Sequence, residues 1–279
     1  MSSFKFLVLA IFSLLAVDLE ALPRTGKYFD RAIFVIFENT NYADAVKQPF
    51  FKQLANTGAL FTNMNAVLHP SQGNYIALTS GDTNGIINDN PKDIDVKNII
   101  DLLEAKGLTW RVYAEDYPGN CFTGKASGNY VRKHNPFISF KDIQSNKTRC
   151  LNIVNASSFA SDAQAGNLPN YVFYVPNLKN DAHDTNISYA DKWYSQNFSS
   201  IVNDSRIMAN TILITTFDES GSSQRNQIYT SIVGPNVRVG AYNDNVSIPS
   251  LLKLMEENWD LGNLGKKDQL ANSIPAIWN

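Results

Sequence analysis

Five short, largely apolar runs without regular polar alternation divide the chain, and they are rich in β-branched and aromatic residues. Such runs are typical of strands buried on both faces, as in a parallel sheet. Segments with helical spacing lie between them, at residues 50–56, 98–105, 189–202 and 248–258. Because strands alternate with helices, we expect an α/β fold, a three-layer α/β/α sandwich with a mostly parallel central sheet. The strands are expected at residues 31–37, 109–114, 171–175, 211–217 and 227–233.

Polar side chains follow four of these predicted strands directly. In α/β folds, ligands bind beyond the carboxyl ends of the strands, so these side chains are expected to share one rim of the sheet. The residues concerned are Glu38-Asn39, Glu115-Asp116, Asn177 and Asp218-Glu219.

A loop ending in His69-Pro70-Ser71 precedes a short apolar run that begins a helix. A Ser at a helix start lies against free backbone N–H groups and the positive end of the helix dipole, which together favour phosphate. The alternative is that Ser71 only caps the helix.

Carboxylates placed at the ends of buried strands are costly unless something compensates their charge. A divalent cation would do so, and carboxylate and amide oxygens suit Mg²⁺, Ca²⁺ or Mn²⁺. The alternative is that these residues merely end strands and begin turns. A metal beside Ser71 would lower the pKa of its hydroxyl and withdraw charge from a phosphoryl oxygen, as phosphoryl transfer requires. The predicted oxygen donors are Glu38, Asn39, Asp218 and Glu219.

The chain has three histidines, and each lies in a polar loop. His183 stands between Asp181 and Asp184, which could hold one tautomer and let it act as the general acid for the leaving group. His134 follows two basic residues and could equally bind anionic phosphate. His69 is expected only to shape the turn before the helix, and solvated loop histidines are the alternative for all three.

Residues 1–21 have the pattern of a secretory signal peptide: Lys5, an apolar run over 6–17 and small residues at 16 and 21. The run is too short to span a bilayer, and a buried N-terminal strand is the alternative. Residues 22–279 show no repeat or linker, so we expect one catalytic domain. A formal charge of −2 argues against a nucleic-acid partner and suggests no membrane patch. We therefore expect a secreted protein without a stable membrane anchor.

Two further features agree with export. Cys121 and Cys150 are the only cysteines, and in an oxidising compartment they should pair. A catalytic or metal-binding role is the alternative, but no CxxC-type partner is present. Six Asn-X-Ser/Thr sequons indicate a glycosylated surface, and they begin at Asn146, Asn155, Asn186, Asn197, Asn203 and Asn245.

Several short motifs occur in a characteristic order. Together they resemble the secreted phosphoesterase family of fungal and bacterial acid phosphatases and phospholipases C, within the alkaline-phosphatase-like superfamily. The motifs are FVIFEN at 34–39, HPS at 69–71 with NY at 74–75, LTSGD at 78–82, RKHNP at 132–136, NDAHD at 180–184 and TFDE at 216–219.

The resemblance implies specific roles. Ser71 would be the nucleophile that forms a phosphoserine intermediate, and it would also be a ligand of the metal held by Glu38, Asn39, Asp218 and Glu219. The phosphate and the leaving group would be lined by Asn74, His134, Asp181 and His183.

The chain also departs from the family pattern at two positions. Gly73 stands where relatives commonly have Pro. Asn245 stands where many relatives have His, which weakens the case for a two-zinc centre, although zinc stays possible.

The resulting prediction is a secreted, metal-dependent acid phosphatase acting on small phosphomonoesters. The nearest alternative is a phospholipase C or other phosphodiesterase. A Ser-His-Asp acyl hydrolase is disfavoured because the chain lacks a G-x-S-x-G elbow around Ser71. An inactive phosphate-binding homologue is a further alternative because of Asn245.

Overall fold

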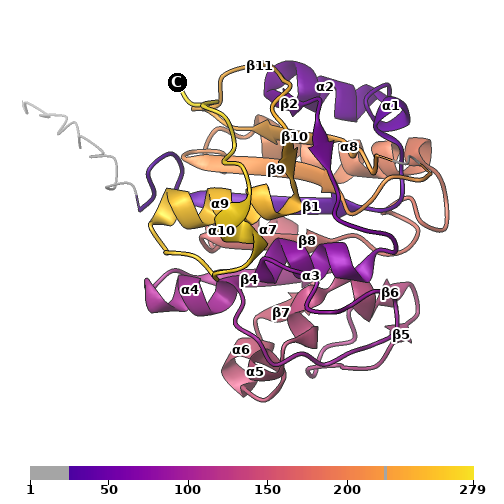
Figure 1. Ribbon diagram of the computed structural model, residues 1–279. Helices are drawn as coiled ribbons and strands as arrows, with labels where there is room; N and C mark the ends of the chain where they lie inside the picture. Colours follow the sequence, from indigo (N-terminus) through magenta and orange to yellow (C-terminus); the bar gives the residue numbers. More distant parts are fainter. Residues whose placement is uncertain (1–24, 223–224) are drawn as a thin grey trace, which may run out of the picture.

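The computed structural model describes residues 25–222 and 225–279, so the predicted signal peptide lies outside the described residues. Its centre is an eight-stranded sheet of order β11-β2-β10-β9-β1-β8-β4-β7, shown in Figure 1. Strand β10 runs antiparallel to both neighbours, whereas the other neighbouring pairs are parallel. The strands are β1 (Arg31–Phe37), β2 (Ala59–Phe61), β4 (Trp110–Ala114), β7 (Ile153–Asn155), β8 (Tyr171–Val175), β9 (Thr211–Phe217), β10 (Thr230–Val233) and β11 (Gly240–Tyr242).

Helices cover both faces of this sheet, which confirms the predicted three-layer α/β architecture. Helices α3, α4 and α9 lie in front of the sheet in Figure 1, whereas α7 and α8 lie behind it. The longer helices are α2 (Pro49–Thr57), α3 (Gln72–Ser80), α4 (Ile99–Ala105), α7 (Phe159–Gln164), α8 (Ile187–Asn203) and α9 (Ile248–Trp259). The shorter ones are α1 (Tyr42–Ala45), α5 (Lys141–Gln144), α6 (Lys147–Cys150), α10 (Lys267–Leu270) and the 3₁₀ turns η1 (Arg132–His134), η2 (Pro136–Ser139) and η3 (Ala156–Ser158).

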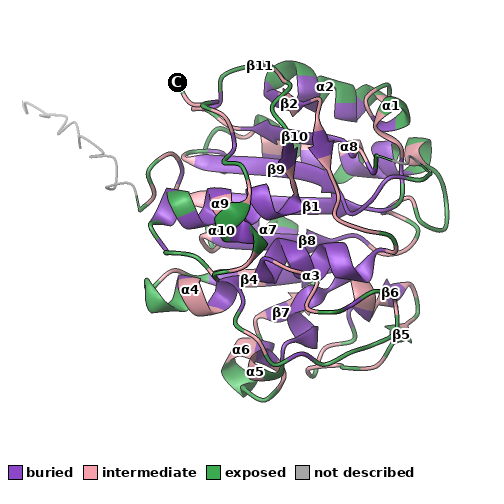
Figure 2. Cartoon of the chain, in the orientation of Figure 1, coloured by how far each residue is buried: buried purple, intermediate pink, exposed green. Residues whose placement is uncertain are grey.

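The central strands are buried because both of their faces are covered. Every residue of β8, β9 and β10 is buried, and so is every residue of β1 after Arg31 (Figure 2). Removing each large apolar side chain from water contributes roughly 1.5–3 kcal/mol to folding. The continuous apolar runs in the sequence therefore correspond to this buried layer.

Short elements account for the differences from the predicted pattern. Residues before Ser71 form β2 and a separate two-residue strand, β3 (Met64–Asn65), which pairs with β12 (Val246–Ser247). The expected strand at 227–233 begins only at Thr230. Strand β7, the six-residue helix α7 and the β5–β6 pair (Ala126–Ser127 and Tyr130–Val131) were not predicted, because elements this short carry little periodic signal.

The strand register places the rim residues side by side. Phe37 of β1 is opposite Phe217 of β9 in a parallel ladder, so Glu38 and Asp218 leave the sheet together. The Asp218 N–H donates to the Phe37 carbonyl at 2.9 Å, and the Glu38 N–H donates to the Asp181 carbonyl at 2.9 Å. Residues about 180 positions apart in sequence therefore meet at the carboxyl edge of the sheet, as expected for this fold class.

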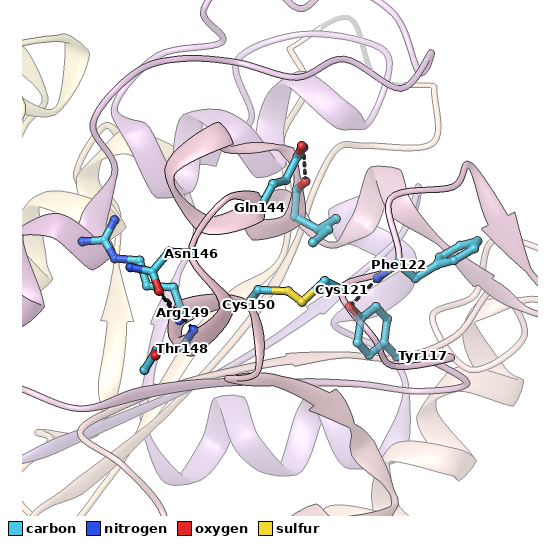
Figure 3. The surroundings of a disulfide bond; sticks show 9 residues. Tyr117, Cys121, Phe122, Gln144, Asn146, Thr148, Arg149 and Cys150 are labelled. Carbon is cyan, nitrogen blue, oxygen red and sulfur yellow. Dashed lines mark hydrogen bonds between the residues drawn. A yellow bond between two sulfur atoms is a disulfide. The ribbon is translucent and has the colours of Figure 1, made fainter.

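The predicted disulfide is present. Cys121, in the loop after β4, is bonded to Cys150 at the end of α6, with a Cα–Cα distance of 5.6 Å (Figure 3). The disulfide therefore joins the beginning and the end of the irregular segment between β4 and β7. The described residues contain no free cysteine.

Replacing both cysteines by serine is expected to lower the free energy of unfolding by about 3.5 kcal/mol. The cross-link spans 29 residues, and a loop of that size restricts the unfolded chain by this amount in the chain-entropy model. Chemical denaturation of the wild type and of the double variant would measure the difference. Equal midpoints and slopes for the two proteins would contradict this expectation.

The predicted glycosylation requires that the sequon asparagines lie at the surface. All six sequon asparagines are exposed, so each is accessible to a glycosylating enzyme. Within residues 25–222 and 225–279, no helix combines the length and the apolar character needed to cross a bilayer.

Candidate active site

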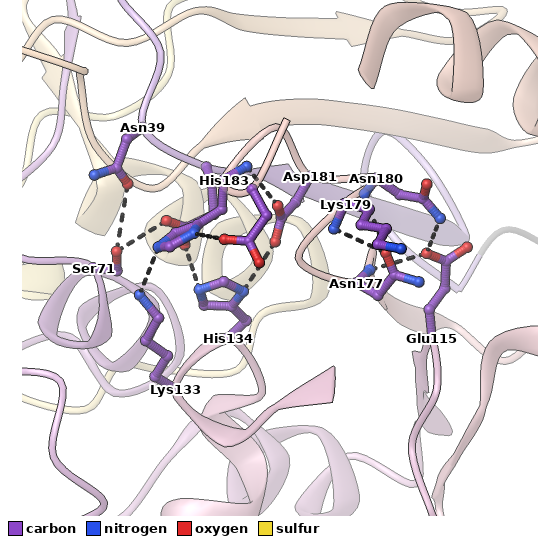
Figure 4. Close-up of polar contacts among 12 residues, drawn as sticks. Asn39, Ser71, Glu115, Lys133, His134, Asn177, Lys179, Asn180, Asp181 and His183 are labelled. Carbon is purple, nitrogen blue, oxygen red and sulfur yellow. Dashed lines mark hydrogen bonds and ion pairs between the residues drawn. The ribbon is translucent and has the colours of Figure 1, made fainter. Parts of the chain in front are cut away.

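Ser71 lies where three distant segments meet. The residue is 1% exposed. Its hydroxyl donates to Glu38 Oε2 at 3.0 Å and to Glu219 Oε1 at 3.3 Å. Asn39 Oδ1 lies 3.5 Å from Ser71 Oγ, and the two side chains point toward each other in Figure 4. The side chain makes no capping bond to helix α3, which it precedes. The hydroxyl therefore faces the carboxylates instead of the helix, so the simple capping alternative does not describe it.

Asp218 is a buried carboxylate directly after β9. It is 2% exposed, and neither of its oxygens receives a hydrogen bond from the described residues. Burial, together with the charges of Glu38 and Glu219, raises the pKa of Asp218 well above its ordinary value. Burial also raises the pKa of Glu219, against the opposing effect of His69, with which Glu219 forms an ion pair. The three neighbouring acids, Glu38, Asp218 and Glu219, therefore carry more negative charge than the cationic side chains beside them can neutralise.

His134 forms a buried bridge between two of the acids. Its Nε2 lies 2.7 Å from Glu38 Oε1 and its Nδ1 lies 3.1 Å from Asp181 Oδ2. Burial of these groups opposes their charges, but the attraction between them prevails and sets the pKa of Glu38 to about 2 and that of His134 to about 9. Tyr75 donates to Glu38 at 3.1 Å and stacks on the imidazole ring. Since His134 is 1% exposed, the structure places it as a fixed cation that positions Glu38 and Asp181.

His183 and Lys133 form the accessible side of the site. The His183 N–H donates to Asp181 Oδ1 at 2.8 Å, and the His183 Nδ1 lies 2.7 Å from Asp184 Oδ1. Its Nε2 lies 3.4 Å from Lys133 Nζ, and these contacts are visible in Figure 4. The His183 side chain is 36% exposed, so it can reach a bound substrate. Asp184 contacts the ring itself, whereas Asp181 accepts from the backbone N–H of His183 and fixes the loop that carries the ring.

Two sequence expectations near Ser71 need revision. The Gln72 N–H, one of the helix donors expected to be free for phosphate, donates instead to Asp89 Oδ1 at 3.0 Å. The buried Asn74 uses its amide oxygen to accept from Val67 and Leu68, and its amide nitrogen to donate to the Leu68 carbonyl. Asn74 therefore holds the loop that precedes the nucleophile, and its contact with substrate stays a prediction.

Sequence reasoning missed three residues of the site. His69 contacts Glu219, and Tyr75 contacts Glu38; both lie within the motifs around Ser71, so their proximity could have been anticipated. Asp89 contacts the first turn of α3 and also accepts from Lys133 Nζ at 3.0 Å. It lies in an irregular loop with no periodic signal.

The donor set fits a divalent cation. The two unpartnered Asp218 oxygens and the excess of negative charge would be satisfied by a cation that also contacts Glu38, Asn39 and Glu219. These are hard oxygen ligands, which suit Mg²⁺, Ca²⁺ or Mn²⁺. Among residues 25–222 and 225–279, no three His, Cys, Asp or Glu side chains have the spacing of a complete metal site. Glu38 is paired with His134 and Glu219 with His69 instead, so a cation would compete with these pairs.

Asn245, which stands where many relatives have histidine, precedes the short strand β12. Its side chain is exposed, and its carbonyl accepts a hydrogen bond from Asn272 at 2.7 Å.

Comparison with known proteins places this site in context. The chain is 37% identical to an acid phosphatase from Aspergillus fumigatus over 268 residues, which is 91% of this chain but 60% of that protein. It is 32% identical to a phosphatidylinositol-3-phosphatase from Mycobacterium tuberculosis, covering 95% of this chain and 90% of that protein. The chain thus spans about 60% of the length of the fungal relative.

A solved structure shows a similar fold, and a family model matches most of the chain. A Vibrio parahaemolyticus protein of the alkaline phosphatase superfamily matches with a TM-score of 0.62 at 12% identity, covering 88% of this chain and 71% of that one, which supports the shared fold. Residues 34–262 match the model of the Phosphoesterase family, a range that contains all the rim residues described above. This chain therefore belongs to the Phosphoesterase family.

Proposed function

We propose that this protein is a metal-dependent phosphoric ester hydrolase, an acid phosphatase that cleaves phosphomonoesters through a phosphoserine intermediate. The observation that carries the proposal is the Ser71 hydroxyl, which lies within hydrogen-bonding distance of Glu38 and Glu219 at the start of α3. This hydroxyl is held by two carboxylates and lies near Asp218, a third, buried carboxylate, which is an arrangement suited to phosphoryl transfer. It makes no hydrogen bond that would cap the helix.

Ser71, His183 and Lys133 have different roles in the proposed reaction. The Ser71 hydroxyl passes its proton to Glu219, 3.3 Å away, as Oγ attacks phosphorus and forms the new Oγ–P bond while the bond to the leaving alcohol breaks. His183, held by Asp184, donates a proton to the departing oxygen, and Lys133 offers positive charge to the phosphoryl oxygens. Water then attacks phosphorus and gives a proton to His183, the Oγ–P bond breaks, and Glu219 returns the proton to Ser71 Oγ. A divalent cation bound by the rim acids would lower the pKa of the Ser71 hydroxyl and withdraw charge from a phosphoryl oxygen.

The relatives favour monoesters over diesters. Those named above are an acid phosphatase and a phosphatidylinositol-3-phosphatase, and both names denote removal of a terminal phosphate. The six exposed sequons and the disulfide support the further proposal that the mature protein is a secreted glycoprotein.

Chelation tests the metal dependence. Removing divalent cations is expected to reduce hydrolysis of p-nitrophenyl phosphate by about a hundredfold or more, and adding back Mg²⁺, Ca²⁺, Mn²⁺ or Zn²⁺ singly should restore it for the preferred ion. Full turnover by metal-free protein would refute metal dependence. Faster cleavage of bis(p-nitrophenyl) phosphate than of the monoester would favour the phosphodiesterase alternative. Tight phosphate binding without turnover at any pH would indicate an inactive homologue.

A further inference from the structure

Asp89 lies on the loop between α3 and α4 and has no role in the reaction described above. Its Oδ1 accepts a hydrogen bond from the Gln72 N–H at 3.0 Å, and its Oδ2 accepts one from Lys133 Nζ at 3.0 Å. Gln72 directly follows Ser71, and Lys133 Nζ lies 3.4 Å from His183 Nε2 (Figure 4). One carboxylate therefore connects the helix start that carries the nucleophile with the accessible side of the site.

The position of Asp89 is fixed by the residue that follows the nucleophile. Gln72 is 2% exposed, and its side-chain amide donates to the carbonyls of Asn88 and Asn90 at 3.1 and 3.0 Å. These two bonds hold the backbone on both sides of Asp89, while the Gln72 N–H holds its carboxylate. The Asp89 side chain is still 32% exposed, so a ligand bound at the site would meet its charge.

Asp89 offsets the charge of Lys133. Burial of the Lys133 side chain opposes its charge, but the carboxylates of Glu38, Asp89 and Asp218 prevail and raise the pKa of Lys133. Lys133 therefore stays protonated at acid and neutral pH. A lone Lys beside the phosphoryl group would attract a doubly charged ester more strongly than a singly charged one, whereas a Lys–Asp pair without net charge gives no such preference.

Other charged groups of the site surround the Lys133–Asp89 pair, and most of them are acids. They are His134, Asp181, His183 and Asp184 on two loop segments, and Glu38, Asp218 and Glu219 at the strand ends, with His69 beside Glu219. A divalent cation held at the strand ends would compensate the acids there. Asp89 would still offset Lys133, because it contacts Lys133 and the start of α3 instead of the strand ends.

We propose that Asp89 determines the charge state of the ester that the site prefers, favouring a phosphoryl group with one negative charge over one with two. A phosphomonoester loses its second proton at about pH 6. The selection would therefore weaken the reaction above that pH and contribute to a preference for acid conditions. This inference rests on the proposed function and adds to it the residue that selects the charge of the substrate.

Two variants of Asp89 and one control test the proposal. Asp89→Asn removes the charge but keeps an oxygen that can accept from Gln72 and Lys133. Asp89→Glu keeps the charge and should keep the wild-type pH dependence. The matched control is Asp95→Asn, the same change on the same loop, at a side chain that is 82% exposed and lies 3.8 Å from Lys141 Nζ. Circular dichroism would verify that each variant is folded.

Two model esters separate substrate charge from protein titration. p-Nitrophenyl phosphate changes from one negative charge to two between pH 5 and pH 8, whereas bis(p-nitrophenyl) phosphate keeps one. The ratio of kcat/KM in Asp89→Asn to that in the wild type should rise about tenfold from pH 5 to pH 8 for the monoester. For the diester, measured as a substrate or as a competitive inhibitor, the ratio should stay within about twofold. Asp95→Asn and Asp89→Glu should show neither rise.

A monoester ratio that is the same at pH 5 and pH 8 would overturn the proposal and leave Asp89 as a positioning residue. An equal rise for both esters would also overturn it, because it would indicate titration of a protein group such as His183. If the wild type hydrolyses neither ester, the proposed function fails. Calorimetric binding of inorganic phosphate to the wild type and to Asp89→Asn at pH 5 and pH 8 would then decide the charge selection by the same tenfold ratio.

Discussion

Ser71→Ala is expected to lower phosphate release from a monoester by at least about a thousandfold while the protein stays folded. The hydroxyl hydrogen-bonds to Glu38 and Glu219, and it makes no capping bond that α3 would lose. Removing it deletes the attacking atom and leaves the surrounding acids in place. Steady-state hydrolysis of p-nitrophenyl phosphate and circular dichroism would measure both effects.

Ser80→Ala is the matched control for this substitution. Ser80 is buried at the other end of the same helix, where its hydroxyl donates to the Ile76 carbonyl at 2.8 Å. Its loss should leave turnover within severalfold of the wild type. Near-normal turnover in Ser71→Ala would exclude Ser71 as the nucleophile.

Asp218→Asn should have opposite effects on the metal-free and the metal-loaded protein. Burial and the neighbouring charges raise the pKa of Asp218 in the folded protein above that in the unfolded chain. The folded state then binds more protons, so the stability of metal-free wild type falls as pH rises above about 4. Asparagine carries no such charge. Near pH 8 the metal-free variant should therefore be more stable than the wild type by about 1–3 kcal/mol, whereas near pH 4 the two should be similar.

Added cation should reverse this order. A metal that binds only the folded wild type at a hundred times its Kd would stabilise it by about 2.7 kcal/mol, and the variant should lose most of this gain. Thermal unfolding at pH 4 and pH 8, with and without the cation, would measure both effects. Asp44→Asn, at an exposed position on α1, is the control and should follow the wild type throughout. An equal cation-induced shift in Asp218→Asn and the wild type would argue against this ligand.

The strands and the rim could be predicted because their signals are local. The run 31–37 is apolar throughout after Arg31, and β1 has these bounds. Once four such strands are parallel, the residues that follow them must share an edge, and Glu38 and Asp218 are indeed adjacent there. The fold class and the meeting of the acids at one edge therefore followed from pattern and topology, whereas the place of Ser71 beside them was implied by the family resemblance.

The partners of individual side chains could not be predicted in the same way. Whether His134 faces solvent or a buried acid depends on the path of an irregular segment, and the structure buries it between Glu38 and Asp181. Asp89 reaches the start of α3 from a loop without periodicity. Asn74 lies within a recognisable motif, but its hydrogen bonds to the preceding loop appear only in three dimensions.

The central claim is that the Ser71 hydroxyl and the acids at 38, 218 and 219 act on phosphate around a single divalent cation. A crystal structure of the protein with vanadate and the activating cation would test it most directly. We predict vanadium at bonding distance from Ser71 Oγ, and one anomalous cation peak contacted by Glu38, Asp218 and Glu219. Vanadate bound away from Ser71, or a cation held by other residues, would contradict the account.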